Sequence, residues 1–209
     1  SRGAVAFVTD ARGAEIAQEE LQTSGAPLAH AVIEQLREQL GHLAALVYGT
    51  RDSAALTFGV TGTNGKTSLV YILVAYLEAL GLTVGLSTTA ERRIGETVQV
   101  SSLTSPEAPE LHALLARMRE QDVDAVGIEV SAQAVARHRI GGVHFNVVAF
   151  TNFSQDHLDD FGSMERYFQA KSELFRPEHA TAGVVVVDSS WGRRVVAEST
   201  IPVTTLATE

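Results

Sequence analysis

The segment Gly62-Thr-Asn-Gly-Lys-Thr67 constrains the fold of this chain more than any other. It follows an apolar, strand-like run over 54–61 and opens a helix-patterned segment over 68–80. This order of strand, glycine loop and helix is typical of nucleotide phosphate sites. The glycines let consecutive backbone N–H groups point at one anion, and the helix N-terminus adds a positive dipole. We expect Lys66 to neutralise the outer phosphates and the Thr67 hydroxyl to ligate Mg2+.

Composition excludes several other classes of protein. The 209 residues carry a formal net charge of −9, which argues against general affinity for nucleic acid or anionic membranes. There are no cysteines, so disulfides and thiolate metal sites are excluded. The sequence shows neither an apolar run of membrane-spanning length nor a signal-peptide pattern. We therefore expect a cytoplasmic protein without a membrane or nucleic-acid partner.

From residue 54 onward, strand-like and helix-like segments alternate. Near-continuous Val, Ile and Phe runs separated by helices predict an α/β fold, with a mostly parallel sheet flanked by helices. Ser105 and Pro106 are expected to begin a helix that runs to about Gln121, with the serine as N-cap. Further strands are predicted at 83–87, 124–130, 146–151, 183–188 and 203–206, a polar hairpin-like stretch through 102, and further helices at about 131–138, 163–175 and 191–199.

The first part of the chain has a different character. A strand-like segment over 4–8 precedes alanine- and glutamate-rich helical sequence that includes 28–48, and 49–53 resembles a linker. We predict a partial small α/β N-terminal domain with its linker over 1–52 and a central domain over 53–209.

Polar residues follow the predicted strands, where ligands of open α/β sheets gather. They are Gly62 to Thr67, Thr88-Thr89, Glu129 to Ser131, Thr151-Asn152 and Asp156-His157. Each group can touch phosphate or Mg2+, and their coincidence favours a phosphoryl-transfer site.

Glu129 is the most specific of these residues. A lone acid that ends an apolar strand is costly to bury unless it is paired or metal-bound. Magnesium ligation is favoured over a solvated strand end or a helix cap. His157, beside Asp156, is a second candidate for metal or proton chemistry, although a loop histidine is more often structural. Arg137 and Arg139 fit either a solvated helix end or recognition of an anionic substrate.

These motifs together resemble the Mur ligases. The similarity rests on the glycine loop, on Thr104-Ser-Pro-Glu-Ala-Pro-Glu110, on Glu129-Val-Ser131 and on Phe150-Thr-Asn-Phe-Ser-Gln-Asp-His-Leu-Asp159 with Gly162-Ser-Met-Glu165. It covers the chain from about Phe58 to its end. The MurE-like branch is the most similar; its members add the third amino acid to UDP-N-acetylmuramoyl-L-alanyl-D-glutamate.

The resemblance implies a reaction and a set of residues. ATP would phosphorylate the D-glutamyl carboxylate, and an amine would then displace phosphate. The acceptor would be diaminopimelate, lysine or ornithine, and the enzyme a monomer. Lys171, by itself an ordinary solvated helix lysine, matches the family's carbamoylated (N6-carboxylated) lysine.

The roles that the resemblance implies fall into four groups. ATP binding would involve Gly62, Thr63, Asn64, Gly65, Lys66, Thr67, Ser68 and Asn152. Catalysis would involve Lys66, Glu129, His157 and Lys171, and Mg2+ would be held by Thr67, Glu129, His157 and carboxylated Lys171. Thr104, Ser105, Ser131, Arg137 and Arg139 would hold the UDP-sugar peptide.

The chain also departs from the family pattern. The usual Ser-Ser-His after Glu-Val is Ser131-Ala132-Gln133 here, Arg137 stands where glutamine is common, and Gln155 where arginine is common. These positions affect the substrate side more than ATP use. No sequence corresponds to the family's C-terminal domain, so we expect this chain alone to bind nucleotide without completing ligation.

Two alternatives remain open at this stage. The chain could belong to another Mur-type or folylpolyglutamate-synthase-like ligase, although the 104–110 segment and Arg139 favour the muramoyl substrate. The amidating MurT-type relatives carry a cysteine zinc ribbon and are disfavoured by the lack of cysteine. A non-catalytic nucleotide-binding module would not need Glu129, His157 and Lys171 together.

Overall fold

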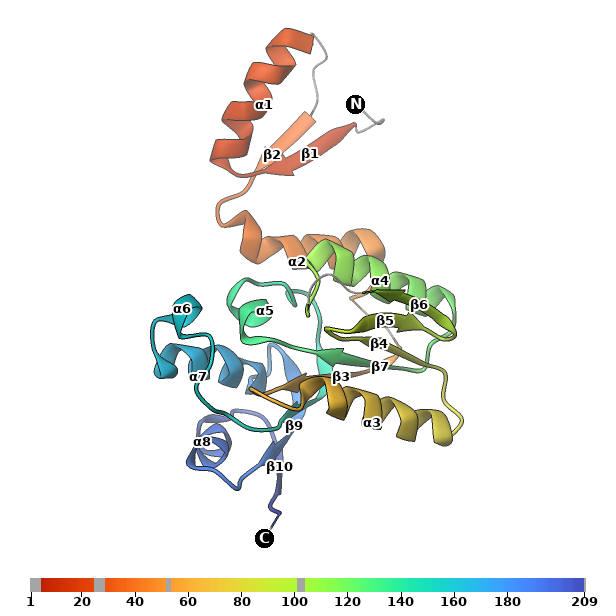
Figure 1. The fold of residues 1–209 in the computed structure, drawn as a ribbon. Helices are drawn as coiled ribbons and strands as arrows, with labels where there is room; N and C mark the ends of the chain where they lie inside the picture. Colours follow the sequence, from red (N-terminus) through yellow and green to blue (C-terminus); the bar gives the residue numbers. More distant parts are fainter. Residues whose placement is uncertain (1–4, 25–28, 52–53, 101–103, 209) are drawn as a thin grey trace.

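The computed structural model describes residues 5–24, 29–51, 54–100 and 104–208 (Figure 1). These residues form a two-stranded sheet of β1 (Ala6–Thr9) and β2 (Ala29–Val32) and an eight-stranded sheet in the order β10-β9-β8-β3-β7-β4-β5-β6. The strands of the large sheet are β3 (Leu56–Thr61), β4 (Val84–Ser87), β5 (Glu91–Ile94), β6 (Thr97–Val100), β7 (Ala125–Glu129), β8 (Phe145–Phe150), β9 (Ala180–Val186) and β10 (Val203–Leu206). The helices are α1 (Ala11–Ser24), α2 (Leu36–Tyr48), α3 (Lys66–Ala79), α4 (Ala108–Glu120), α5 (Ala132–Ala136), α6 (Leu158–Phe161), α7 (Met164–Ser172), the 3-10 turn η1 (Glu173–Phe175) and α8 (Ser190–Glu198).

Strand β3 occupies the middle of the large sheet. It pairs in parallel with β7 on one side and β8 on the other, and β4, β9 and β10 extend the parallel part. The hairpin β5–β6 adds two antiparallel strands at one edge, while residues 101–102 of the predicted hairpin lie outside the described residues. The predicted α/β fold with a mostly parallel, helix-flanked sheet is confirmed.

The register of β7 determines which way its last side chain points. Successive strand residues face opposite sides of a sheet. A Cβ on Gly127 would lie 3.0 Å from Val70 of α3, so this position faces α3, whereas Ile128 belongs to the apolar cluster on the other face. Glu129, two residues after Gly127, therefore points to the α3 side, where the glycine loop ends.

The helix α2 is attached to the rest of the fold through a close backbone approach. A Cβ on Gly41 would lie 2.1 Å from the carbonyl oxygen of Gly141, so only glycine fits there. His112 of α4 is fully buried beside this contact; its Nδ1 lies 2.6 Å from Thr50 Oγ1 and its Nε2 2.8 Å from Gly141 O. Because a carbonyl only accepts, Nε2 carries the proton, and the threonine hydroxyl donates to Nδ1. Burial lowers the pKa of His112, which fits this neutral ring.

The prediction that Ser105 caps a helix was wrong. The helix α4 begins three residues later, with Glu107 at the N-cap and Pro109 in its first turn. The Ser105 hydroxyl instead donates to the carbonyl oxygen of Glu129 at 3.0 Å. A hydroxyl committed to a distant strand end is not available as a cap.

The prediction of helical sequence over 28–48 was also wrong in its first part. Residues Ala29–Val32 form β2, which pairs in parallel with β1, and α2 begins only at Leu36 after Gln35 in a left-handed conformation (φ 52°). Four residues of mixed pattern do not distinguish helix from strand, and pairing with β1 decides between them. Residues 52–53 of the predicted linker lie outside the described residues, and the domain division at 52/53 stays a prediction.

Figure 1 shows the β1–α1–β2 unit beyond α2, with α2 between it and the large sheet. Within the described ranges, no helix is long and apolar enough to cross a bilayer.

An ion-pair network joins α7 to α8 and provides a test of this packing. Arg194 donates to both carboxylate oxygens of Glu165, at 2.5 and 2.7 Å, and this together with a bond from Gln169 lowers the pKa of Glu165 to about 2. The folded pKa lies below the unfolded value. The pair therefore stabilises the fold above about pH 4.5 and loses this effect as pH falls towards about 2.

We predict that Glu165→Gln lowers the melting temperature slightly at neutral pH, because exposed pairs contribute little. The difference from wild type should shrink to nothing as pH approaches about 2. Thermal unfolding followed by circular dichroism across this pH range measures it. Glu120→Gln, at an acid without an ion pair among the described residues, is the control. A difference that persists at low pH would contradict the assignment.

Candidate nucleotide and metal site

The glycine loop connects β3 to α3 and is fixed by the end of β8. Gly62 has φ +145° and Gly65 φ +80°, conformations that side chains rarely adopt. A Cβ on Gly62 would also lie 2.0 Å from Thr151 Oγ1. Asn152 bonds Asn64 in both directions, since its Oδ1 accepts from the Asn64 amide at 3.0 Å and its Nδ2 donates to the Asn64 carbonyl at 3.0 Å. The two glycines therefore allow the backbone conformation of the loop, and the hydrogen bonds from Asn152 fix its central residue, Asn64.

Glu129 is the buried acid at the end of β7, with 3% of its surface exposed. Its Oε2 accepts hydrogen bonds from Thr67 Oγ1 at 2.8 Å, from the Thr89 amide at 3.0 Å and from Thr89 Oγ1 at 3.1 Å. The Lys66 ammonium lies 3.9 Å from Oε1 and donates to the carbonyl of Thr63 at 2.9 Å. Burial lowers the pKa of Lys66, and the charge of Glu129 opposes this shift. Ser68 lies on the exposed side of the same helical turn.

Lys171, on α7, is buried beneath the glycine loop with 1% exposure. Its Nζ donates to the carbonyl of Gly62 at 2.7 Å and lies 4.6 Å from the centre of the Tyr167 ring. Burial, with the nearby Lys66 charge, lowers the pKa of Lys171 to about 7. Among the described residues, the contacts of this buried amine are a carbonyl and an aromatic ring, and no carboxylate forms an ion pair with it.

His157 lies at the rim of the site. It is the N-cap residue of α6, in a left-handed conformation (φ 49°), and its side chain is 43% exposed. Its Nε2 lies 3.4 Å from Asp156 Oδ2, and its ring meets the Tyr167 ring edge-on at 5.8 Å. Among the described residues, no hydrogen bond or ion pair joins His157 to Glu129 or Thr67. The structure thus places His157 beside the site through Tyr167 rather than directly against the buried acid.

Three of the predicted substrate residues lie around the end of β7. Ser105 is buried, and its Oγ lies 3.0 Å from the Glu129 carbonyl, to which it donates, and 3.4 Å from the amide of Ser131. Ser131 caps α5 by accepting a hydrogen bond from the Ala134 amide at 3.1 Å. Thr104 Oγ1 lies 3.0 Å from Thr89 Oγ1, within hydrogen-bond distance, so it lies next to the Glu129 cluster.

The predicted substrate arginines both have acidic partners. Arg139 donates to Glu107 at 2.9 Å. Arg137 lies 3.3 Å from Asp160 of α6, and Gln133 donates to the second oxygen of Asp160 at 3.0 Å. Gln133 and Arg137, two of the departures from the family pattern, therefore bind the same carboxylate and link α5 to α6. Gln155, the third, is exposed.

Sequence reasoning did not assign a role to Thr89 or Tyr167. Thr89 follows a predicted strand and in sequence resembles an ordinary turn residue; its two hydrogen bonds to Glu129 appear only in the structure. Tyr167 lies four residues before Lys171, and residues at this spacing share one face of a helix. That spacing is the signal that could have indicated it.

The donor set beside the loop fits a magnesium ion. Thr67 and Glu129 present a hydroxyl and a carboxylate, the hard oxygen ligands that Mg2+ prefers. Mg2+ is commonly bound by one or two side chains, with phosphates and water completing its shell. Within the part of the chain that the structure describes, no three acidic or histidine side chains form a cluster able to hold a metal by themselves. The residues therefore fit a Mg2+ ion that is bound together with a nucleotide phosphate, rather than one whose ligands all come from the protein.

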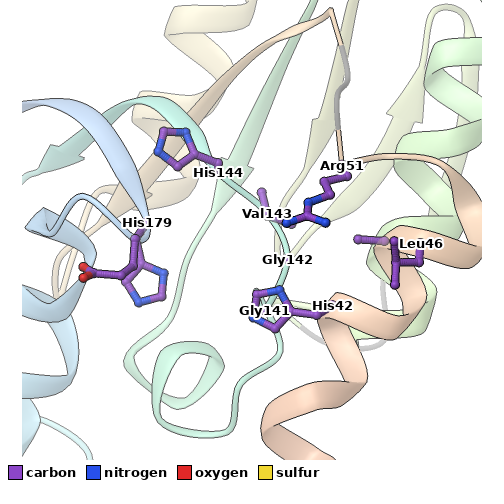
Figure 2. A pocket seen from close by; sticks show the side chains of 10 residues that line it. His42, Leu46, Arg51, Gly141, Gly142, Val143, His144 and His179 are labelled. Atoms are coloured by element: carbon purple, nitrogen blue, oxygen red, sulfur yellow. The ribbon is translucent and has the colours of Figure 1, made fainter.

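A separate cavity of about 510 Å³ lies at the opposite end of the strands, where β8 and β9 begin (Figure 2). His144 and His179 immediately precede β8 and β9, whereas the glycine loop follows the carboxyl end of the parallel β3. Figure 2 shows these two histidines facing Arg51, Leu46 and His42 across the open space. None of the residues predicted for the site lines this cavity.

Comparisons with known proteins agree with the motif resemblance. The family model described as the Mur ligase middle domain matches residues 60–208. A UDP-N-acetylmuramyl-tripeptide synthetase of Leifsonia xyli subsp. xyli is 57% identical over 203 residues, covering 97% of this chain and 38% of that protein. A UDP-N-acetylmuramoyl-L-alanyl-D-glutamate--2,6-diaminopimelate ligase of Corynebacterium glutamicum is 45% identical over 212 residues, covering 99% of this chain and 40% of that protein.

Solved structures share the fold. A structure of a UDP-N-acetylmuramoyl-L-alanyl-D-glutamate--2,6-diaminopimelate ligase aligns with a TM-score of 0.80 at 19% identity, covering 98% of this chain and 46% of that one. E. coli FolC in complex with DHPP and ADP aligns with a TM-score of 0.59 at 24% identity, covering 79% and 45%. The chain thus spans only 38% to 40% of the two curated relatives compared above. With its glycine loop, buried acid and buried lysine assembled at the carboxyl end of the sheet, the chain belongs to the Mur ligase family and carries that family's middle domain.

Proposed function

We propose that the complete protein is an ATP-dependent amide ligase that adds the third amino acid to UDP-MurNAc-L-Ala-D-Glu in peptidoglycan precursor synthesis. The names of the relatives in Leifsonia and Corynebacterium support the reaction and the substrate. This chain supplies the ATP-binding part, and the acceptor amino acid is diaminopimelate, lysine or ornithine. ATP and a UDP-linked sugar are cytoplasmic compounds, so we propose that the reaction takes place in the cytoplasm. We also propose that the enzyme acts as a monomer.

One observation carries the proposal. The buried Glu129 carboxylate and the Thr67 hydroxyl lie 2.8 Å apart at the mouth of the phosphate loop, with Lys66 beside them. Lys171 contacts the same loop from below through the carbonyl of Gly62. A protein that only bound a nucleotide would gain nothing from burying Lys171 at this point, because burying an amine that has no carboxylate partner among the described residues is costly.

The proposed reaction has two steps, and the first brings two anionic reactants together. A carboxylate oxygen of the D-glutamyl residue attacks the γ-phosphorus of ATP, ADP leaves, and an acyl phosphate forms. The acceptor amine then attacks the acyl carbon, loses a proton and expels inorganic phosphate. Both reactants of the first step are anions, so the site must screen their repulsion and hold them in line. Lys66 and the loop amides perform this screening.

A magnesium ion held by Thr67, Glu129 and the phosphates, with His157 at a second metal, would neutralise charge that builds up on the transferred phosphoryl group. We propose that Lys171 carries an N6-carboxylate. The ammonium of Lys171 would first lose one proton, and the neutral amine would then bond to the carbon of CO2 and release a second, so that a buried cation becomes an anion. The nearby Lys66 charge, which destabilises the ammonium of Lys171, would then stabilise the product.

We propose that residues in the segments 104–105 and 131–139, next to this site, bind the substrate. Thr104, Ser131, Arg137 and Arg139 would contact the UDP-sugar peptide, with the arginines exchanging their acidic partners for the substrate's anionic groups. Ser105 is buried, so it would act by holding the end of β7 in place.

Phosphate release by the complete protein tests this function. We expect release only when Mg-ATP, UDP-MurNAc-L-Ala-D-Glu and one of the three amino acids are present together. Release with a folate and glutamate instead would favour a folylpolyglutamate-synthase-like ligase, whose solved structures share this fold. Nucleotide binding without turnover under all these conditions would favour a non-catalytic module.

We predict that Lys66→Ala weakens Mg-ATP binding to the complete protein by roughly 10- to 100-fold, because a charge-assisted bond to phosphate contributes about 1.5–3 kcal/mol. Isothermal titration calorimetry measures the change. Arg117→Ala, which removes an exposed cation from α4, is the matched control and should bind as wild type does. Equal affinities for wild type and Lys66→Ala would remove the phosphate-loop assignment.

We predict that Lys171→Ala in the complete protein lowers kcat by at least roughly 100-fold, the loss typical of removing one electrostatic stabiliser. Added bicarbonate should not restore activity, since alanine has no amine to carboxylate. Arg166→Ala, at an exposed position of the same helix, should remain active. Activity of Lys171→Ala near that of wild type would exclude the carboxylated-lysine role.

A further inference from the structure

Tyr167 is the side chain on which three parts of the proposed site meet. Its hydroxyl lies 3.3 Å from Thr63 Oγ1 in the glycine loop. Its ring lies 4.6 Å from Nζ of Lys171 and 5.8 Å from the ring of His157. Only 1% of Tyr167 is exposed, so each of these contacts is shielded from solvent on the tyrosine side.

The hydroxyl contact extends into the loop. Thr63 Oγ1 accepts a hydrogen bond from the Ser154 amide at 3.1 Å, and the Thr63 amide donates to the carbonyl of Asn152 at 3.0 Å. Thr63 is therefore held from the segment after β8 and from α7 at once. Lys66 donates to the carbonyl of this same threonine, so the position of Thr63 also affects the phosphate-binding lysine.

The ring contact concerns the environment of Lys171. The Tyr167 ring covers one side of Nζ, and the Gly62 carbonyl is the single hydrogen-bond partner that the described residues offer it. Phe153 and Phe161 also pack against the ring, at 4.8 and 5.4 Å between ring centres, and restrict its orientation. Removing the ring would open a path for water to the amine, whereas removing only the hydroxyl would leave this cover in place.

We propose that Tyr167 is a positioning residue with two separable functions. Its ring keeps water from Lys171 so that the carboxylated lysine persists, and its hydroxyl fixes Thr63 so that the loop is ordered for ATP. The proposal rests on the ligase function and on the carboxylation of Lys171 proposed above. Decarboxylation is the reverse of carboxylation, in which the N–C bond breaks, the nitrogen takes up a proton and CO2 leaves. A dry environment denies the nitrogen that proton.

The test compares Tyr167→Phe and Tyr167→Leu in the complete protein. Tyr167→Phe should raise KM for ATP by roughly 2- to 10-fold with little change in kcat, the loss of one neutral hydrogen bond. It should keep the carbamate carbon signal that 13C NMR detects after equilibration with 13C-bicarbonate. Tyr167→Leu should lose most of that signal at ambient CO2 and regain both signal and activity as bicarbonate is raised. Lys171→Ala identifies the signal.

Trp191→Leu is the matched control. Trp191 belongs to the same aromatic cluster, at 4.7 Å from Phe153, but no described contact joins it to Thr63, Lys171 or His157. Trp191→Leu should show the wild-type KM for ATP and the wild-type carbamate signal, and its activity should depend on bicarbonate as that of the wild type does. Circular dichroism reports whether each variant folds, and Tyr167→Met, whose longer and more flexible side chain can fill an irregular gap, replaces Tyr167→Leu if that variant does not.

The outcomes separate this inference from the function on which it rests. A wild-type signal in Tyr167→Leu with unchanged bicarbonate dependence would overturn the role of the ring alone. A wild-type KM for ATP in Tyr167→Phe would overturn the role of the hydroxyl. A wild-type protein without any carbamate signal would instead remove the proposed modification of Lys171 and the role of the ring with it.

Discussion

The burial of the Glu129 carboxylate is the constraint on which the site depends. A carboxylate with 3% exposure must be fully paired, and Glu129 draws its partners from two separate segments: Lys66 and Thr67 at the start of α3, and Thr89 after β4. These segments are brought together because β7 lies between β3 and β4 in the sheet. The strand order thus supplies the partners, and the alternation along β7 turns the carboxylate towards them.

Lys171, which contacts the same loop, is a buried charged group whose charge is not balanced in this way. Its amine is equally buried, yet its partners are a carbonyl and an aromatic ring rather than a carboxylate. Burial therefore works against its charge instead of being balanced by it. The two buried groups share a neighbour in Lys66, whose charge stabilises Glu129 and destabilises a second cation. Of these two buried groups, Lys171 is therefore the one whose charged form is less stable, so it is the one more readily converted to another chemical form.

The fold and the loop were largely predictable, because both rest on local pattern. The apolar run before Gly62, the glycines themselves and the helix after them form one continuous signal. The strand Ala29–Val32 and the true start of α4 were not predictable in this way. In each case a distant partner decides: β1 for the strand, and the end of β7 for Ser105. Local propensity is weak over four residues, and a single long-range pairing is enough to override it.

The sequence by itself determined the class of fold and the glycine loop between β3 and α3, since these follow from residues that are neighbours along the chain. Only the tertiary structure decided that Thr89 closes the Glu129 cluster, that Gln133 and Arg137 bind one carboxylate of α6, and that Tyr167 joins the loop to Lys171. The physical reason is that these contacts join segments brought together by strand order and helix packing, and spacing along the chain does not specify which side chains then meet.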